Sequence, residues 1–391
     1  MALVPFLFLS EMSVAITSRV TIVYLTSTSL AAWLIQRGLL SPAAITAGNF
    51  AIQELEHHNR GFCVYRPAEQ SIYVKQLREL DRPNMQCLLR EAAFGNALAN
   101  SDGLDWLRNH VPEFLDYDVR HHAVTIRLIP KSVNLHECIE QCGVMPNQLM
   151  SQLGATIASF RTAECDAILS SMPAESLLCK APWILSFHID QGAGFLSPQN
   201  EEFLNLLKND RLLTRHFDEL HDSWRVESLM HGDLKWNNVL TRLGGGTNSE
   251  GEWFIIDWEM VDRGDPLWDL ATMVQCWWHY WILSTPPDQL SDFDMLRVQR
   301  KQAFDETRIS LNLLWAGYVE AAKLHGPSYD DCRRRLVKMA AARMLQSVYE
   351  LLNTVGVAAQ YIELMIEMSR RVFADPDSMT DFYPGATSDA V

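Results

Sequence analysis

One short segment carries the residue types that phosphoryl transfer needs. Residues 230–240 read M-H-G-D-L-K-W-N-N-V-L, so Asp233 is followed five residues later by Asn238, between apolar ends. In a phosphoryl-transfer loop such an aspartate orients the attacking hydroxyl and accepts its proton, while the asparagine holds a metal ion on the phosphates. Lys235 is placed to reach the transferring group as a point charge. The competing interpretation is a turn in which Asp233 only caps local structure.

Two acidic segments follow this loop. Residues 254–259 read F-I-I-D-W-E and place Asp257 at the end of an apolar strand, 24 positions after Asp233. A carboxylate there is a hard-oxygen ligand suited to magnesium, although an exposed acid at a strand end is the alternative. Residues 264–271 read G-D-P-L-W-D-L-A, in which Asp269 opens a helix. Such an aspartate commonly fixes a neighbouring loop through backbone N–H groups.

In this order and spacing, the three segments resemble the aminoglycoside phosphotransferase and choline kinase superfamily, which shares its fold with protein kinases. The resemblance spans nearly the whole chain and implies ATP and Mg²⁺ as cofactors. It implies that Asp233 is the catalytic base, that Asn238 and Asp257 are the magnesium ligands, and that Asp269 is the structural aspartate beneath the catalytic loop.

The resemblance also gives a reason for a lysine within an apolar strand. Residues 72–76 read I-Y-V-K-Q, and burying Lys75 is costly unless an anion and a carboxylate satisfy it. ATP phosphates and Glu91, 16 residues further on in a helical stretch, are the partners that the resemblance implies. Otherwise Lys75 would extend from an edge strand and Glu91 would be solvated.

One feature departs from the protein-kinase pattern. No G-x-G-x-x-G precedes Lys75, and residues 57–62 read H-H-N-R-G-F, with a single glycine. A short loop with its backbone N–H groups, and Arg60 with its charge, could still meet the phosphates. The phosphate-loop contacts therefore stay unassigned.

The surrounding pattern predicts an α+β, bilobal protein-kinase-like fold, with a small N-terminal β-sheet lobe and a larger, mainly helical C-terminal lobe. We expect an N-terminal extension and helix over 1–40, a nucleotide-binding lobe over 41–130 and a lobe with the catalytic loop over 131–391. The expected helices are 26–40, 83–99, 149–160, 296–323, 328–355 and 357–373, and the expected strands are 50–56, 62–66, 71–77, 113–118 and 123–129. Residues 243–252 read as a hairpin turn between two short strands.

Composition limits the possible partners. The chain has 391 residues, 48% hydrophobic and 21% charged, and its net charge of −15 argues against non-specific nucleic-acid binding. Eight scattered cysteines without a C-x-x-C pair indicate reduced thiols in a cytoplasmic protein. The apolar stretches 4–9 and 14–25 are too interrupted for a signal peptide or a membrane span, and we expect an added strand or a partner-facing segment instead.

Two further groups of residues have ordinary explanations. The pairs His57–His58 and His121–His122 lack a third ligand at metal spacing, so we expect loop and strand-edge histidines at the surface. An aromatic group after Asp269 is interpreted as core, or as the wall of an acceptor pocket. It consists of Trp277, Trp278, Tyr280 and Trp281.

The leading hypothesis is transfer of a phosphoryl group from ATP to a hydroxyl, with two acceptor classes. Amino sugars, choline-like alcohols and sugars are the small-molecule candidates. The alternative is a peptide: the D-L-K triplet is similar to protein kinases, and residues 60–62 and 73–76 resemble kinase-like proteins of lanthipeptide biosynthesis, which phosphorylate Ser or Thr of a precursor so that a partner lyase can eliminate phosphate. A non-catalytic, nucleotide-binding scaffold is a third hypothesis. Against it stands the joint presence of Lys75, Glu91, Asp233, Asn238 and Asp257.

Overall fold

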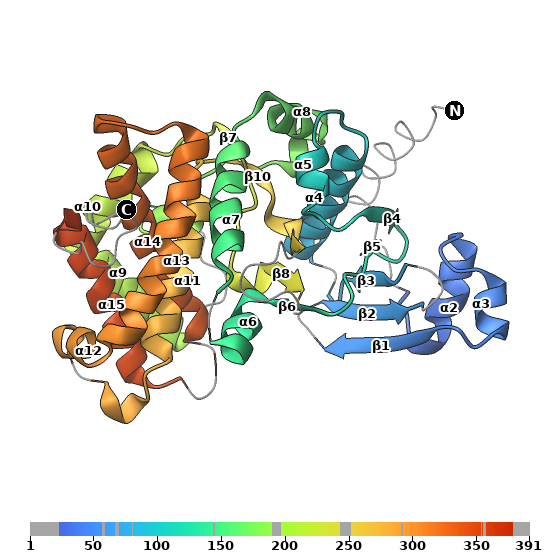
Figure 1. Ribbon diagram of the computed structural model, residues 1–391, viewed down its shortest axis with the longest axis horizontal. Coiled ribbons are helices and arrows are strands. Elements are labelled where there is room, and N and C mark those ends of the chain that lie inside the picture. Colours follow the sequence, from blue (N-terminus) through green and yellow to red (C-terminus); the bar gives the residue numbers. More distant parts are fainter. Residues whose placement is uncertain are drawn as a thin grey trace.

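The structure is a computed structural model that describes residues 23–377 apart from 57–58, 67–69, 80, 144, 190–196, 243–251, 291, 353 and 355–356. Figure 1 shows a smaller lobe built on a sheet beside a larger lobe of helices. Most of the N-terminal stretch 1–40, the 57–58 part of the phosphate-facing turn and most of the 243–252 turn lie outside the described residues.

The smaller lobe is a five-stranded sheet in the order β1-β2-β3-β5-β4, and every neighbouring pair is antiparallel. Helix α4 (Arg82–Ala99) follows β3, and helices α2 (Ser27–Gln36) and α3 (Pro42–Thr46) precede the sheet. The strands are β1 (Ala51–Glu56), β2 (Arg60–Tyr65), β3 (Ile72–Gln76), β4 (Phe114–Asp118) and β5 (Ala123–Arg127).

Alternation along β3 decides which side chains meet which helix. Ile72 and Val74 are fully buried with Leu30 and Leu34 of α2 on one face of the sheet. Because neighbouring residues of a strand point to opposite faces, Lys75 points to the other face. That face is covered by α4, which carries Glu91. The alternation along β3 therefore places Lys75 within reach of Glu91 on α4.

The main hydrophobic core spans both lobes, while the α2 side of the sheet forms a second, separate cluster. Phe94 of α4 stacks on Trp258 of the larger lobe, with ring centroids 4.2 Å apart and an interplanar angle of 18°. The N–H of Ile255 also donates to the carbonyl of His110 at 2.7 Å. Helix α4 thus packs into the larger lobe as well as onto the sheet.

The larger lobe is mainly helical and contains two small sheets. Strand β6 (Ser132–Asn134) pairs with β8 (Val239–Arg242), which pairs with β9 (Trp253–Ile255), while β7 (Ser228–Met230) pairs with β10 (Asp262–Gly264). Its helices in the described chain are α6 (Leu135–Cys142), α7 (Asn147–Ser159), α8 (Ala163–Ser171), α9 (Pro198–Asn209), α10 (Arg211–Asp222), α11 (Trp268–Leu283), α12 (Phe293–Gln299), α13 (Lys301–Ala322), α14 (Pro327–Leu351) and α15 (Ala359–Ala374), with α5 (Asp105–Arg108) lying in the smaller lobe.

The first helix is capped by Thr26, whose hydroxyl accepts the N–H of Ser29. Two expectations need correction. The stretch 296–323 is divided into α12 and α13. His122 is buried with 1% of its surface exposed, rather than lying at the surface, because the pairing of β3 with β5 continues to it: its carbonyl accepts the N–H of Leu77 at 3.2 Å.

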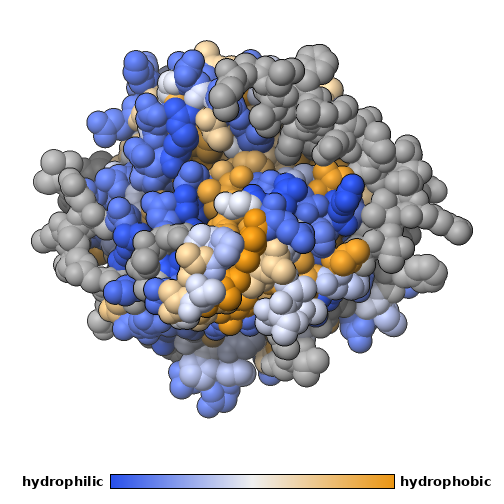
Figure 2. Space-filling view, turned by 90° about the vertical axis from the view of Figure 1, so that its right-hand side faces the viewer, coloured by the Kyte–Doolittle hydropathy of each residue, from blue (hydrophilic) through white to orange (hydrophobic). Residues whose placement is uncertain are grey.

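Three features of the structure concern its cysteines, its helices and its surface. All eight cysteines are free, as predicted. Within the described part of the chain, none of the helices has both the length and the apolar character needed to cross a bilayer. Figure 2 views the molecule from the smaller lobe and shows apolar side chains interspersed with polar ones; the exposed apolar residues of this lobe include Val23, Tyr24, Ile45 and Tyr65.

Candidate active site

Two strand pairs bring the acidic segments to the 231–238 loop. Strand β7 leads into the loop and pairs with β10, so that Met230 lies opposite Asp262. The loop ends in a 3₁₀ turn, Trp236–Asn238, from which β8 begins. Because β8 and β9 are antiparallel, the chain after β9 returns to the end of the loop, where the N–H of Ile256 donates to the carbonyl of Asn238 at 2.9 Å. Asn238 and Asp257 therefore lie in neighbouring segments.

Asp269, at the start of α11, fixes the beginning of the loop. Its two carboxylate oxygens accept the N–H groups of His231 at 2.7 Å and Gly232 at 3.0 Å. Burial raises the pKa of Asp269, and the two N–H groups oppose this shift by stabilising the ionised form. Gly232 has φ +84°, and a Cβ there would lie 2.5 Å from the carbonyl oxygen of Met260. Only glycine fits this close approach.

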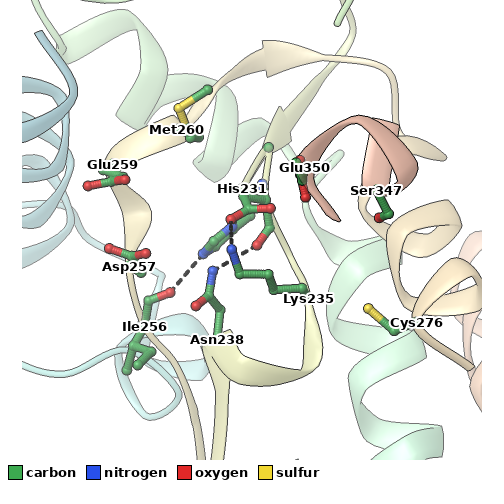
Figure 3. A network of polar contacts seen from close by, with 12 residues as sticks. His231, Lys235, Asn238, Ile256, Asp257, Glu259, Met260, Cys276, Ser347 and Glu350 are labelled. Atoms are coloured by element: carbon green, nitrogen blue, oxygen red, sulfur yellow. Dashed lines mark hydrogen bonds and ion pairs between the residues drawn. The ribbon is translucent and has the colours of Figure 1, made fainter. Parts of the chain in front are cut away.

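His231 joins the loop to the segment that carries Asp257. Its Nδ1 accepts the N–H of Asp233 at 3.3 Å, and its Nε2 lies 2.9 Å from the carbonyl of Ile256 (Figure 3). A carbonyl can only accept, so Nε2 is the nitrogen that donates and Nδ1 is the acceptor. The imidazole is fully buried and serves as a brace between the two segments.

The Asp233 carboxylate has a different cation on each oxygen. Lys235 Nζ donates to Oδ2 at 2.7 Å, and Arg343 Nη2 from helix α14 donates to Oδ1 at 3.2 Å. Burial alone would lower the pKa of Lys235, but the Asp233 carboxylate raises it above its ordinary value. The Nδ2 of Asn238 donates to the Asp233 carbonyl at 2.9 Å, which leaves its Oδ1 as the remaining polar atom of that side chain.

Lys75 is surrounded by three carboxylates at the junction of the lobes. Its Nζ donates to Glu91 at 2.9 Å, to Glu259 at 2.7 Å and to Asp257. Burial lowers the pKa of Lys75, but the carboxylates outweigh burial and hold it well above its ordinary value. Burial raises the pKa of Glu91 to about 7, with Lys75 opposing the shift. For Asp257, Lys75 outweighs burial and lowers the pKa.

The same carboxylates are suited to a hard divalent cation. One oxygen from each of Glu91, Asp257 and Glu259 lies within 4.8 Å of the others. Asp257 has φ +67° and ψ 52°, a left-handed backbone that costs a non-glycine residue on the order of 1 kcal/mol and that often occurs at functional sites. All the donors are oxygens, which is the ligand set that Mg²⁺ prefers.

The structure brings the predicted site residues together in two adjoining polar groups. Lys75, Glu91 and Asp257 form one group, and Asp233, Lys235 and Asn238 form the other. The hydrogen bond from the N–H of Ile256 to the carbonyl of Asn238 links the two groups. Figure 3 shows Asp257 and Glu259 on one side of the 231–238 loop, and Cys276, Ser347 and Glu350 on the other. Glu259 and Arg343 belong to the site as well, although neither had a predicted role. The second acid of D-W-E was a signal for Glu259, and a single arginine within the apolar run 339–345 was a signal for Arg343.

Two other expectations have clear outcomes. Arg60 lies in β2, where it pairs with Glu54 at 2.8 Å. The aromatic group on α11 is core at Trp277, Trp278 and Trp281, each 1% exposed.

The sheet lobe, the helical lobe and the polar network between them define a bilobal, protein-kinase-like phosphotransferase. The chain belongs to the phosphotransferase enzyme family (APH), whose family model matches residues 88–294. The predicted aminoglycoside phosphotransferase and choline kinase superfamily is thereby confirmed, and the protein is a phosphotransferase with an alcohol group as acceptor.

Solved structures of other phosphotransferases align with this chain at low sequence identity. An ethanolamine kinase from Plasmodium vivax aligns with a TM-score of 0.53 and 11% identity, over 96% of this chain and 95% of that one. A choline kinase from Cryptosporidium parvum gives 0.49 and 10%, over 88% and 94% of the chains. A macrolide 2'-phosphotransferase from Brachybacterium faecium gives 0.44 and 15%, over 89% and 98%. A search of curated proteins found no significant match.

Proposed function

We propose that this protein transfers the γ-phosphoryl group of ATP to the hydroxyl of a small-molecule alcohol, with Mg²⁺ as the metal. The single observation that carries the proposal is the convergence of Asp233, Lys235, Asn238, Asp257 and Lys75 at the junction of the two lobes. A cap or a solvated strand end would not require a lysine within 2.9 Å of two carboxylates.

Asp233 is the proposed general base. It takes the proton of the acceptor hydroxyl as the oxygen forms its bond to the γ-phosphorus, while the bond from phosphorus to the bridging oxygen breaks and its electron pair leaves with ADP. Lys235 reaches the Asp233 carboxylate with a flexible side chain that is 41% exposed. We assign it to the transferring phosphoryl group, where its charge would stabilise the developing negative charge.

Lys75 and Glu91 form the proposed nucleotide-binding pair. Glu91 holds the ammonium in place from α4, and Lys75 would donate to phosphate oxygens of ATP. Asp257 and Asn238 are the proposed magnesium ligands, and Glu259 adds a third oxygen donor to this group. When bound, the ion neutralises phosphate charge.

A small alcohol is the acceptor class that we propose, in keeping with the acceptor named for the Plasmodium vivax enzyme. The net charge of −15 would favour a cationic member of this class through long-range attraction. A Ser or Thr hydroxyl of a lanthipeptide precursor, with a partner lyase, is the competing acceptor and enters the test as an outcome.

The test uses the full chain with Mg²⁺ and ATP, and a panel of ethanolamine, choline, amino sugars, sugars and Ser/Thr-rich peptides. Products are read by mass as the gain of one phosphate. Asp233→Asn should lower kcat by about 10²–10⁴, and Asp257→Asn should abolish the magnesium dependence of ATP binding in calorimetry.

Asp222→Asn is the control, because that side chain is 85% exposed on α10. Full turnover by Asp233→Asn would refute the proposed base. Phosphate on peptides alone would refute the small-alcohol acceptor while leaving the chemistry intact.

A further inference from the structure

Helix α14 carries one charged side chain in a buried stretch, residues 340–345, that is otherwise apolar. Residues 340–342, 344 and 345 are fully buried alanine, methionine and leucine, whereas the side chain between them is Arg343, itself 2% exposed. Burying a guanidinium costs several kcal/mol unless it is paired and hydrogen-bonded. A hydrophobic residue would serve packing at this position, so the arginine needs another explanation.

The guanidinium is satisfied by groups on two elements. On its own helix, Arg343 Nη1 donates to the Ser347 hydroxyl at 3.1 Å and to Glu350 Oε1 at 3.3 Å. Its Nη2 reaches across to Asp233 Oδ1 at 3.2 Å. Burial works against the charge, but Glu350 and Asp233 outweigh it and raise the pKa of Arg343 above its ordinary value. The arginine is therefore anchored to α14 while it contacts the catalytic loop.

The two oxygens of Asp233 consequently have unequal partners. The partner of Oδ2 is Lys235, a flexible side chain that is 41% exposed. The partner of Oδ1 is Arg343, whose side chain is 3% exposed and whose Nη1 is held by Ser347 and Glu350. A general base needs one oxygen directed at the hydroxyl that it deprotonates, and rotation of the carboxylate would lose that geometry. A fixed donor on one oxygen defines the direction of the other.

We propose that Arg343 is a positioning residue for Asp233: it holds Oδ1 from helix α14 so that Oδ2 is the oxygen that receives the acceptor's proton. This inference rests on the proposed function, since it presumes that Asp233 is the base. Nothing in the family match reaches the arginine, because that match ends at residue 294. The geometry makes a helix distant in sequence part of the catalytic arrangement.

The experiment is a double-mutant cycle in kcat with Asp233→Asn and Arg343→Gln. If Arg343 acts through Asp233, Arg343→Gln should lower kcat by about 10- to 100-fold alone, the scale of a misplaced catalytic group, and should cost little more in the Asp233→Asn background. The KM for ATP should stay within about twofold, because the arginine contacts no nucleotide-binding residue. Arg343→Lys should recover part of kcat, since lysine keeps the charge but cannot bond Asp233 and the α14 side chains through two separate nitrogens.

Arg334→Gln is the matched control. Arg334 also lies on α14 and also pairs with an aspartate, Asp377, but this pair is away from the site. It should keep wild-type kcat. Additive losses in the cycle, or a raised KM for the acceptor at unchanged kcat, would overturn the positioning role. Melting temperatures show whether each variant folds. If Arg343→Gln does not fold, the kcat of Arg343→Lys tests the positioning role in its place. Full activity of Asp233→Asn would refute the proposed function. A normal kcat in Arg343→Gln, with Asp233→Asn inactive, would refute only the positioning role of Arg343.

Discussion

Replacing Asp269 by asparagine should separate loop positioning from general stability. The aspartate is 3% exposed, and each of its oxygens accepts one backbone N–H of the catalytic loop. Asparagine has nearly the same shape but only one acceptor oxygen. Whichever way its amide is oriented, an NH₂ group must face the N–H of His231 or of Gly232.

The size of the effect follows from these two bonds. Hydrogen bonds to a charged group contribute about 1.5–3 kcal/mol each, and an unsatisfied buried N–H costs about 1–3 kcal/mol. The neutral amide avoids part of the cost of burying the carboxylate, which is the cost that raises the pKa of Asp269. We therefore expect a net loss of about 1–3 kcal/mol, or a few degrees in Tm for a chain of this length. The freed loop should lower kcat by about 100-fold.

The assay compares Tm and kcat in Asp269→Asn with those in Asp118→Asn. Asp118 is also buried and also accepts two backbone N–H groups, from Arg120 at 2.8 Å and His121 at 3.2 Å, but it lies in the sheet lobe away from the catalytic loop. The control should lose stability without losing kcat. Equal kcat losses in both variants, or wild-type kcat in Asp269→Asn, would refute the view that Asp269 positions the loop.

Two other predictions concern the backbone and acid stability. Gly232→Ala should lower the free energy of unfolding by more than the roughly 1–2 kcal/mol of a left-handed backbone, because its Cβ would lie 2.5 Å from the carbonyl oxygen of Met260. Gly38→Ala is the control for the backbone effect alone, since Gly38 has φ +71° and its Cβ would have nothing within 4 Å. Thermal melting compares the two variants. Burial lowers the pKa of His279 from 6.5 to about 4, so the unfolded chain binds an extra proton between these values and stability should fall as pH drops from 6.5 to 4. The fall should reach about 3 kcal/mol, and urea unfolding of His279→Phe should lack this contribution. An unchanged slope in the variant would contradict that origin.

The local parts of the site were predictable because short-range chemistry specifies them. Strand alternation places Lys75 on the face opposite Val74, and helix periodicity places Glu91 within reach of it. The catalytic loop was likewise recognisable from the spacing of Asp233 and Asn238. The five strands of the sheet were predictable from the same kind of pattern, whereas their order and antiparallel pairing come from the structure.

The remaining features depend on contacts that no local pattern specifies. Arg343 meets Asp233 across 110 positions of sequence, so its partner is decided by how α14 packs. The second acid of D-W-E reaches Lys75 only because a 3₁₀ turn, Trp258–Met260, follows the left-handed Asp257. His122 was expected at the surface because its burial depends on the pairing of its backbone with Leu77, a residue distant from it in sequence.

The stacking of Phe94 on Trp258 has a practical consequence for dividing this protein. A gene cut near residue 130 would separate α4 from the partners of its apolar side, among them Trp258. The sheet fragment would then carry Leu88, Leu89 and Phe94 into water, with transfer costs of about 1.5–3 kcal/mol for each large side chain. Such a fragment should self-associate or aggregate when expressed alone, and should regain solubility when the complementary half is co-expressed. We therefore expect the two lobes to be soluble when produced together as a split pair, and not when each is produced alone.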